Sequence, residues 1–367
     1  MASPTTAHDP GPTTGEDDVT GPPEITAPMR PRSARRTSGS FQTRRQQVRY
    51  WLVLSLMILL SVGFGFGLLA YDNPVPISDD RFWIIARMRA TDVVVMALVA
   101  TCQAIATVAF QTVTNNRIIT PSIMGFESLY VAVQTSAVYF LGVAGVVAVQ
   151  GVPQFALQVA LMVVFALFLY GWLLSGRYAN LQVMLLVGII IGAGLGSVST
   201  FMQRLLTPSE FDVLTARLFG SVSNADADYL PLAIPLCVLA TGAILLRARR
   251  LNVVALGRDI SMGLGVNHRA EIIKVLFLVS ILMAVSTAMI GRMTFLGFLV
   301  ATLAYQFSGT HDHRYTLPMA GLTGFVVLSG AYFVMRNIFS AAGVVSILIE
   351  FVGGIVFLVV ILRKGRL

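Results

Sequence analysis

The sequence has 367 residues, of which 56% are hydrophobic and 12% charged, and its formal net charge at pH 7 is +8. Soluble domains carry about 25% charged residues, so this composition excludes a soluble protein and argues against nucleic acid as the reason for the positive charge. Continuous apolar runs of about 20 residues recur from Trp51 onward, whereas membrane β-barrel strands alternate polar and apolar residues. We therefore predict an all-α polytopic membrane protein.

The N-terminal region, residues 1–48, differs from the rest of the chain. It is rich in Pro, Thr, Ser, Gly and Arg and poor in aromatic residues, a composition typical of disorder. It lacks the apolar core of a signal peptide. Arg44, Arg45 and Arg49 adjoin the first apolar run, as is common on the cytoplasmic side. We predict a disordered cytoplasmic tail over residues 1–48 and a transmembrane domain over residues 49–367.

About ten membrane spans are predicted in this domain. A cytoplasmic N-terminus would place 19 of the 26 Lys and Arg residues inside and seven outside, in agreement with the positive-inside rule. Both termini are therefore expected in the cytoplasm, with the chain in a cytoplasmic membrane. The seven outer arginines are Arg81, Arg87, Arg89, Arg204, Arg217, Arg292 and Arg336. The spans cover residues 51–70, 91–113, 122–141, 153–175, 181–203, 229–246, 272–291, 293–308, 317–335 and 343–362.

The largest internal loop, residues 247–271, is predicted to be cytoplasmic and contains the stretch ALGRDISMGLGV. Three of its apolar residues repeat every fourth position, so a helix would place them on one face and its charged pair elsewhere. Such a helix is suited to docking in the groove of a soluble partner or to lying on lipid headgroups, and the pattern alone favours neither. The residues of interest are Leu256, Gly257, Arg258, Asp259, Ile260, Leu264 and Gly265.

Two carboxylates fall inside predicted spans, where a charge is costly and indicates a cavity, a partner or a function. Glu127 follows Gly125 at the start of the third span, near the expected inner surface, where it would also favour the helix dipole. Glu350 lies midway along the last span. For Glu350 we favour a packing or interface role over pore lining or gating.

Polar residues elsewhere provide further pore or gate candidates. Asn116 lies in the turn between the second and third spans, where turn formation explains it as well as a contact near an inner gate does. Ser197 and Ser199 belong to a stripe of small residues in the fifth span, which close helix packing can explain.

No catalytic or cofactor site is predicted. His311 and His313 flank Asp312, but metal sites usually gather three or more ligands, and nothing else converges there. The sequence contains no GxxxxGK[ST] phosphate-binding loop and no evident nucleophile–base pair. We expect a transport component that is not an enzyme, does not hydrolyse ATP itself, and holds neither cofactor nor metal.

Four segments, in this order, resemble the FecCD-type permeases, the membrane subunits of type II ABC importers for iron–siderophore complexes, haem and vitamin B12. The resemblance covers residues 50–367 and is closest to the second permease of siderophore systems that use two different chains. The four segments are FQTVTNNRIITPSIMGFESLY at 110–130, ALGRDISMGLGVNHR at 255–269, STAMIGRMTFLGFLV at 286–300 and GTHDHRYTLPMAG at 309–321.

The resemblance implies partners and roles. Loop 247–271 would couple to an ATPase, and the fifth span would line a pore at a dimer axis. Arg89 and Arg336 would contact acidic residues of an extracytoplasmic siderophore-binding protein, with snorkelling to headgroups as the alternative. Asp92 departs from a second arginine common in the family. The implied assembly is a heterodimer with a second permease, two ATP-binding cassette subunits and a binding protein.

The substrate expected from this resemblance is a ferric siderophore, moved by alternating access. Haem and cobalamin remain alternatives within the same family. A secondary transporter driven by an ion gradient is the alternative from a different class, and it would need ion-coupling carboxylates at mid-bilayer. Glu350 is the one good mid-span candidate for such a carboxylate.

Overall fold

A computed structural model of the chain describes residues 39–71, 80–149, 151–175, 181–222, 225–339 and 345–364. These residues form helices and turns, and their β-pairing is limited to an isolated bridge between Phe219 and Arg292. Nine helices of this part of the chain are long and apolar enough to cross a membrane, and α11 is a shorter apolar helix. The prediction of an all-α, multi-pass membrane protein is confirmed.

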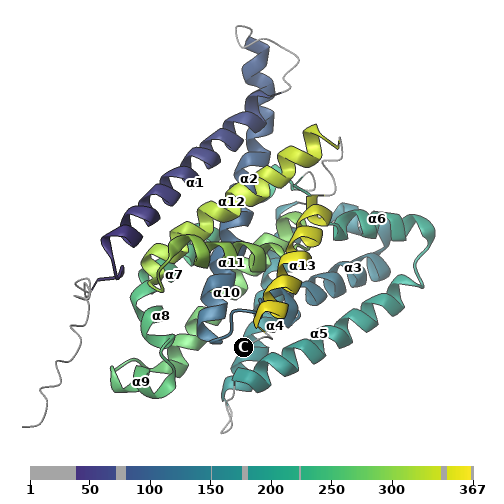
Figure 1. Cartoon of the computed structure of the whole chain (residues 1–367). Coiled ribbons are helices and arrows are strands. Elements are labelled where there is room, and N and C mark those ends of the chain that lie inside the picture. The colour runs from purple at the N-terminus through teal and green to yellow at the C-terminus, as the bar shows by residue number, and fades with distance from the viewer. Residues whose placement is uncertain are drawn as a thin grey trace, which may run out of the picture. The chain divides into compact units, whose positions relative to one another are not determined.

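Ten helices match the ten predicted spans, and α6, α8 and α9 lie in the connections between them (Figure 1). Short 3-10 turns precede α3 and α7, at Ser122–Met124 and Ala227–Tyr229. In chain order the helices are α1 (Arg44–Ala70), α2 (Asp80–Val113), α3 (Phe126–Ala148), α4 (Val152–Ser175), α5 (Leu181–Gln203), α6 (Pro208–Leu218), α7 (Leu230–Leu246), α8 (Ala248–Val254), α9 (Arg258–Gly263), α10 (His268–Ile290), α11 (Leu296–Ser308), α12 (His313–Asn337) and α13 (Val345–Lys364).

Helix α1 begins before the predicted tail ends. The Thr43 side chain accepts a hydrogen bond from the Gln46 N–H and caps the helix. Phe41 is buried, with its ring 4.9 Å from that of Tyr315. The predicted boundary at residue 48 is therefore wrong, because an aromatic anchor and a capped helix precede it. Residues 1–38, which hold most of the predicted tail, lie outside the described residues.

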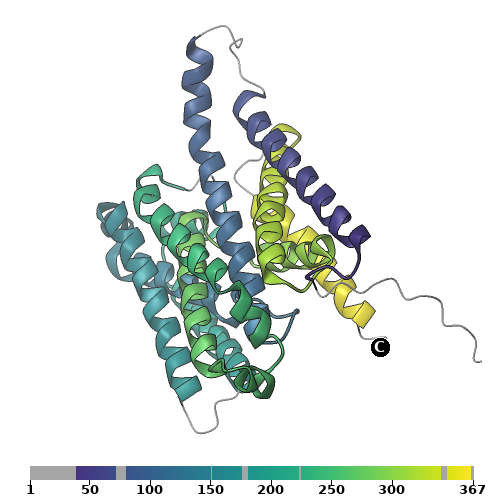
Figure 2. The same cartoon turned by 90° about the vertical axis from the view of Figure 1, so that its left-hand side faces the viewer.

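Helices α2 and α10 form the centre of the core. In their most apolar windows 78% and 67% of the residues are buried, against 11% in α1, which identifies α1 as a peripheral helix of this chain. Helix α2 packs against α1, α7, α8, α10, α11 and α12 (Figure 2). Its length explains part of this central role. At 34 residues it spans about 51 Å, so its first turns project beyond a hydrocarbon core of about 30 Å.

Helix α11 is too short to span the membrane. Its 13 residues rise about 20 Å, whereas the 25 residues of α12 rise about 38 Å. The two helices are joined at one end by residues 309–312, so their other ends lie at different levels. Arg292, in the turn before α11, is half-buried, and its predicted position at the outer surface stays a prediction.

Candidate functional site

The predicted coupling loop, residues 247–271, contains two short helices, α8 and α9. Gly257, with φ +94°, separates α8 from α9, and Gly265, with φ +79°, follows α9. Gly257 adopts a left-handed conformation that other residues rarely adopt, so the chain turns here between the two helices. The predicted apolar face of Leu256, Ile260 and Leu264 is exposed, and Met262 extends it. The side chains of these four residues are 54–61% exposed.

The base of this loop is braced. The Glu271 carboxylate, at 4% exposure, accepts a hydrogen bond from Arg247 at 2.8 Å and faces Arg250 at 3.6 Å. Ser261 is fully buried, and its hydroxyl donates to the Val253 carbonyl at 2.9 Å, which ties α9 to α8. Arg258 and Asp259 are exposed at the start of α9. The loop is therefore a rigid support for exposed apolar and charged side chains.

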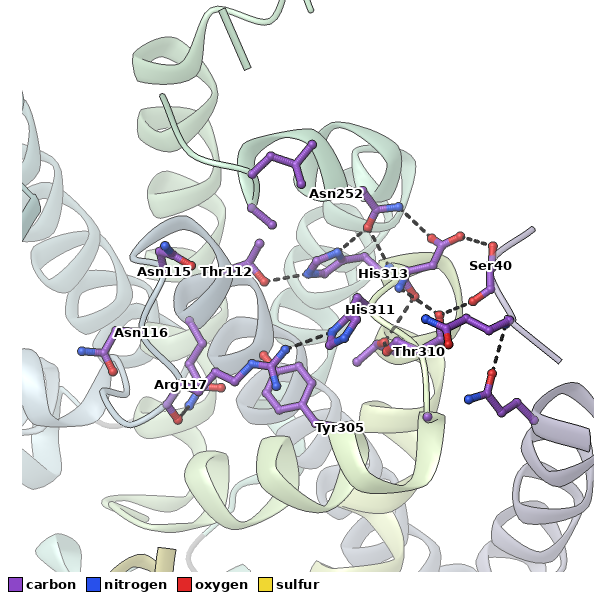
Figure 3. A pocket seen from close by; sticks show the side chains of 18 of the residues that line it. Ser40, Thr112, Asn115, Asn116, Arg117, Asn252, Tyr305, Thr310, His311 and His313 are labelled. Atoms are coloured by element: carbon purple, nitrogen blue, oxygen red, sulfur yellow. Dashed lines mark hydrogen bonds between the residues drawn. The ribbon is translucent and has the colours of Figure 1, made fainter. Parts of the chain in front are cut away.

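A polar pocket of about 1050 Å³ opens beside this loop (Figure 3). Its lining includes Leu256 and residues from the ends of α2 and α11 and from the connections that follow them. The Arg117 guanidinium lies 4.6 Å from the centre of the Tyr305 ring and 3.1 Å from His311 Nδ1. Asn116 also lines the pocket, and its Oδ1 accepts the Ile118 N–H. Asn116 therefore has a turn-forming contact, and its side chain lies at the wall of the pocket.

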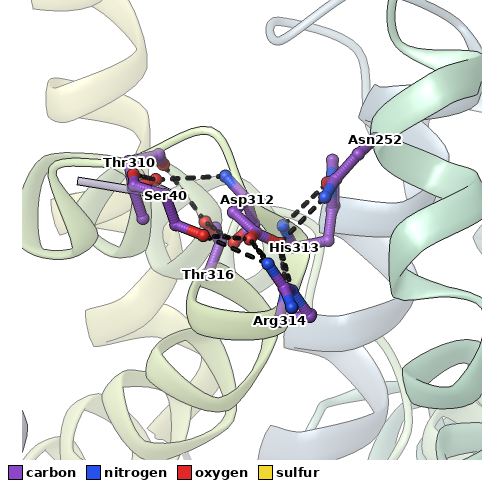
Figure 4. Close-up of polar contacts among 7 residues, drawn as sticks. All are labelled: Ser40, Asn252, Thr310, Asp312, His313, Arg314 and Thr316. Atoms are coloured by element: carbon purple, nitrogen blue, oxygen red, sulfur yellow. Dashed lines mark hydrogen bonds and ion pairs between the residues drawn. The ribbon is translucent and has the colours of Figure 1, made fainter. Parts of the chain in front are cut away.

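Asp312 is the centre of a polar network beside this pocket (Figure 4). As N-cap of α12 it accepts from the Arg314 backbone N–H, and its carboxylate also accepts from Asn252 at 2.8 Å and from Ser40. Burial raises the pKa of this carboxyl, but the hydrogen bonds from Arg314, Ser40 and Asn252 outweigh burial and hold the pKa well below its usual value. The network joins the segment before α1, α8 and the start of α12.

The two histidines beside Asp312 have ordinary hydrogen-bond partners. His313 lies between Asn252 Oδ1, 2.5 Å from Nδ1, and Thr112 Oγ1, 2.6 Å from Nε2. His311 contacts Arg117. Among the residues for which the structure gives positions, no group of three or more His, Cys, Asp or Glu residues is arranged to hold a metal ion.

The outer arginines predicted to dock a binding protein lie near one another. Arg89 donates to the Tyr71 carbonyl at 2.7 Å, and Arg336 lies in the last turn of α12. Both are within electrostatic range of Asp92, which accepts a hydrogen bond from Tyr332 at 3.2 Å. The residue that departs from the family pattern therefore lies within electrostatic range of both docking candidates.

The two intramembrane carboxylates meet at one residue. The Thr294 hydroxyl donates to Glu127 Oε2 at 2.5 Å, and the Thr294 backbone N–H donates to Glu350. Arg292 lies within electrostatic range of both carboxylates. Glu127 is thus buried inside the protein beside the turn before α11, and its predicted depth near the inner surface stays a prediction. We call Glu127, Arg292, Thr294 and Glu350 the polar node.

Non-helical backbone surrounds the polar node. The Ser221 N–H donates to the Ile290 carbonyl at 2.9 Å, next to the bridge between Phe219 and Arg292. Gly220 lies so close to the Arg292 carbonyl that a Cβ there would overlap it. Irregular backbone at membrane depth is tolerated where protein covers and pairs it, as it does here.

The two serines of α5 differ in environment. Ser197 is exposed and donates to the Ala193 carbonyl at 3.0 Å. Ser199 is 1% exposed and donates to the Leu195 carbonyl at 2.7 Å. The open stripe continues through Gly194 and Gly196, where an added Cβ would meet no neighbour within 4 Å. Pore lining therefore stays a prediction for both serines, and in this conformation only the Ser197 side chain is exposed.

Helix α6 was not predicted from the sequence, and neither was the role of Arg292 and Thr294 in the polar node. A local signal for α6 was present, because Thr207, Pro208 and Glu210 form a capping box with proline at the first helical position. Thr294 and Arg292 had no such signal, since their significance depends on Glu127, which is 167 residues from Thr294 in the sequence.

Comparison with known proteins agrees with this architecture. The FecCD transport family matches residues 51–363. The petrobactin import system permease protein FatC of Bacillus anthracis is 51% identical over 90% of this chain and 94% of its own length. The petrobactin import system permease protein FatD of the same organism is 25% identical over 78% of this chain and 83% of its own length.

A solved structure shares the fold. It is an inward-facing conformation of a metal-chelate type ABC transporter, with a TM-score of 0.71 and 22% identity. The match covers 86% of this chain and 99% of that chain, so nearly all of the solved permease has a counterpart here.

Proposed function

Because the chain belongs to the FecCD transport family, we propose that it is a permease subunit of an ATP-driven importer of ferric siderophores, with petrobactin-type chelates as the substrate. The likeness to FatC supports this substrate. Haem and cobalamin are the alternatives that the uptake experiment below separates from it.

The exposed apolar surface of the coupling loop carries the proposal. Leu256, Ile260, Met262 and Leu264 are more than half exposed on a loop whose base is held by ion pairs and buried hydrogen bonds. A braced apolar surface flanked by Arg258 and Asp259 is suited to a partner groove with a polar rim. We propose that an ATPase subunit docks here, so that loop 247–271 is cytoplasmic and both termini are also cytoplasmic.

The assembly is proposed to contain two different permeases. FatC and FatD carry the same system name in one organism, and this chain is 51% identical to the first and 25% identical to the second. We infer that this chain fills the FatC-like position beside a FatD-like partner. An extracytoplasmic binding protein would approach Arg89 and Arg336, where charge complementarity would set docking orientation and association rate.

Uptake of radiolabelled ferric petrobactin in a deletion strain tests this function. The intact chain should restore uptake, and the Leu256→Asp/Ile260→Asp variant should reach the membrane without restoring it. Burial of each apolar side chain contributes roughly 1.5–3 kcal/mol, so the double variant should bind the ATPase at least about 100-fold more weakly. Leu205→Asp is the matched control, because Leu205 has the same 54% exposure as Leu256 and lies after α5, away from the coupling loop.

Each result has one meaning. Co-purification of the ATPase with the Leu205→Asp control but not with the double variant supports coupling at this surface. Full uptake by the double variant would refute the coupling role and favour an ion-driven transporter. Normal petrobactin uptake in the deletion strain would refute the siderophore assignment, and haem and cobalamin uptake would then be measured.

A further inference from the structure

The polar node contains two unpartnered buried atoms of opposite character. Among the described residues, Glu127 Oε1 and Arg292 Nε are buried without a hydrogen-bond partner. One is a carboxylate acceptor and the other a guanidinium donor, and both residues lie beside Thr294. Buried polar groups are nearly always satisfied, and an exception calls for a functional or conformational explanation.

The charges of the node also point to an incomplete arrangement. Arg292 is within electrostatic range of both Glu127 and Glu350. Glu350 is half-buried and accepts the Thr294 N–H. Glu127 is 7% exposed, so water reaches it less than Glu350, and its carboxylate depends more on a protein partner. The Ser122 hydroxyl also interacts with the Glu127 carboxylate, and the unused donor of opposite charge within the polar node is that of Arg292.

The backbone around the two residues belongs to different parts of the molecule. Arg292 follows Gly291, and its strand-like pairing with Phe219 ties it to the connection after α6. Glu127 lies in the first turn of α3 after Gly125, whose backbone packs closely against Gly192 of α5. Any movement of α5 and α3 against the segment after α6 would change the distance between Glu127 and Arg292.

We infer that Glu127 and Arg292 are the two halves of an ion pair that is open in this conformation and closes in another conformation of the transport cycle. Thr294 holds the Glu127 carboxylate through its other oxygen while the pair is open. Arg292 is thus a positioning residue that links α3 and α5 to the turn before α11. This inference rests on the proposed function, because it requires a cycle with more than one conformation.

State-dependent cross-linking of the assembled importer tests the pair. Glu127→Cys and Arg292→Cys are introduced together in a Cys102→Ala/Cys237→Ala background, and the complex is reconstituted in lipid nanodiscs. A short bifunctional methanethiosulfonate is applied without nucleotide and after trapping with ATP and vanadate, and the linked peptides are quantified by mass spectrometry. The Ser221→Cys/Ile290→Cys pair is the matched control, because these residues are joined by a backbone hydrogen bond of 2.9 Å.

The yield for the 127–292 pair should differ at least about fivefold between the two states, as a shift between two populated conformations requires, while the control pair stays constant. Equal yields in both states, or no product in either, would overturn the inference. In cells, Glu127→Gln keeps an acceptor for Thr294 but removes the charge, and it should lower uptake about tenfold at normal membrane abundance. Normal uptake by Glu127→Gln would also contradict the pair.

Charge reversal separates pairing from a general need for each charge. Glu127→Arg and Arg292→Glu should each abolish uptake, and the double variant should recover part of it, because each single change leaves like charges together. No recovery in a double variant that folds would count against the pair. Uptake by the unmodified chain reports on the proposed function itself, so failure of the importer assignment and failure of the ion pair give different results.

Discussion

The coupling loop and the polar node differ in where they place charged and apolar side chains. In the coupling loop, the buried Glu271 carboxylate braces the base, and apolar side chains are exposed to meet a partner. In the polar node, two carboxylates and an arginine lie among apolar helices, and both carboxylates belong to helices long enough to cross a membrane. Each region places side chains in an environment that their polarity does not favour. Such exceptions indicate a functional role.

The two regions also differ in how complete their contacts are. The braces of the coupling loop are satisfied, since Glu271 binds Arg247 and Ser261 binds Val253. The polar node leaves Glu127 Oε1 and Arg292 Nε without partners among the described residues. A satisfied network holds one geometry, whereas a partly satisfied one is consistent with a second geometry. The comparison therefore predicts a rigid coupling loop and a mobile node.

Gly220→Ala should break the polar node most severely. A Cβ at Gly220 would overlap the Arg292 carbonyl, which belongs to backbone and cannot rotate away as a side chain could. Overpacking of this kind costs about 3 kcal/mol, and we expect a large drop in the melting temperature of the detergent-purified complex. Gly242→Ala in α7 is the control, because nothing lies within 4 Å of its added Cβ. Equal melting temperatures for the two variants would refute the tight backbone packing.

Glu271→Gln should loosen the coupling loop without unfolding the membrane helices. Loss of the charge-assisted bond to Arg247 at 2.8 Å should cost about 2 kcal/mol. Hydrogen exchange should rise in residues 248–266 and stay unchanged in α2. Arg250→Gln provides the comparison, because its 3.6 Å contact involves a 59% exposed side chain and exposed pairs contribute under about 1 kcal/mol. A larger effect from Arg250→Gln would show that the wrong arginine was assigned as the brace.

Sequence patterns predicted the fold well because apolar runs directly encode membrane spans. The ten apolar helices and the exposed apolar residues of the coupling loop follow from hydropathy, periodicity and the resemblance at residues 255–269, although α11 is too short to be the span that was predicted. Gly257 and Gly263 indicated that this stretch could turn tightly, but glycine permits a left-handed turn without requiring it, so the exact position of the break could not be assigned from the sequence. Helix α6 was missed although its capping box was readable at Thr207.

The polar node could be predicted only in part. Glu127 and Glu350 were selected because a carboxylate in a span is costly, and the structure shows that they share Thr294. Their meeting could not be predicted, because the residues are far apart in sequence and no local period links them.

The Asp312 network offers the smallest test, at the junction between the coupling loop and the segment before α1. Asp312→Ala removes the N-cap of α12 and the acceptor for Asn252 and Ser40, and loss of a cap costs about 1 kcal/mol. Hydrogen exchange should therefore rise moderately in residues 39–43 and 309–316. Asp312→Asn is the control, since it keeps a capping oxygen and should show a smaller rise.

The pH dependence of this effect follows from the low pKa of the Asp312 carboxyl. A carboxyl whose folded pKa is depressed contributes stability above its unfolded pKa of about 3.9 and loses it as pH falls toward the folded value. The difference in stability between the native chain and Asp312→Ala should thus be constant from neutral pH to about pH 5 and shrink in more acidic solution. A difference that instead grows on acidification would mean that Asp312 is protonated in the folded protein, and that the network bracing the coupling loop is not ionic.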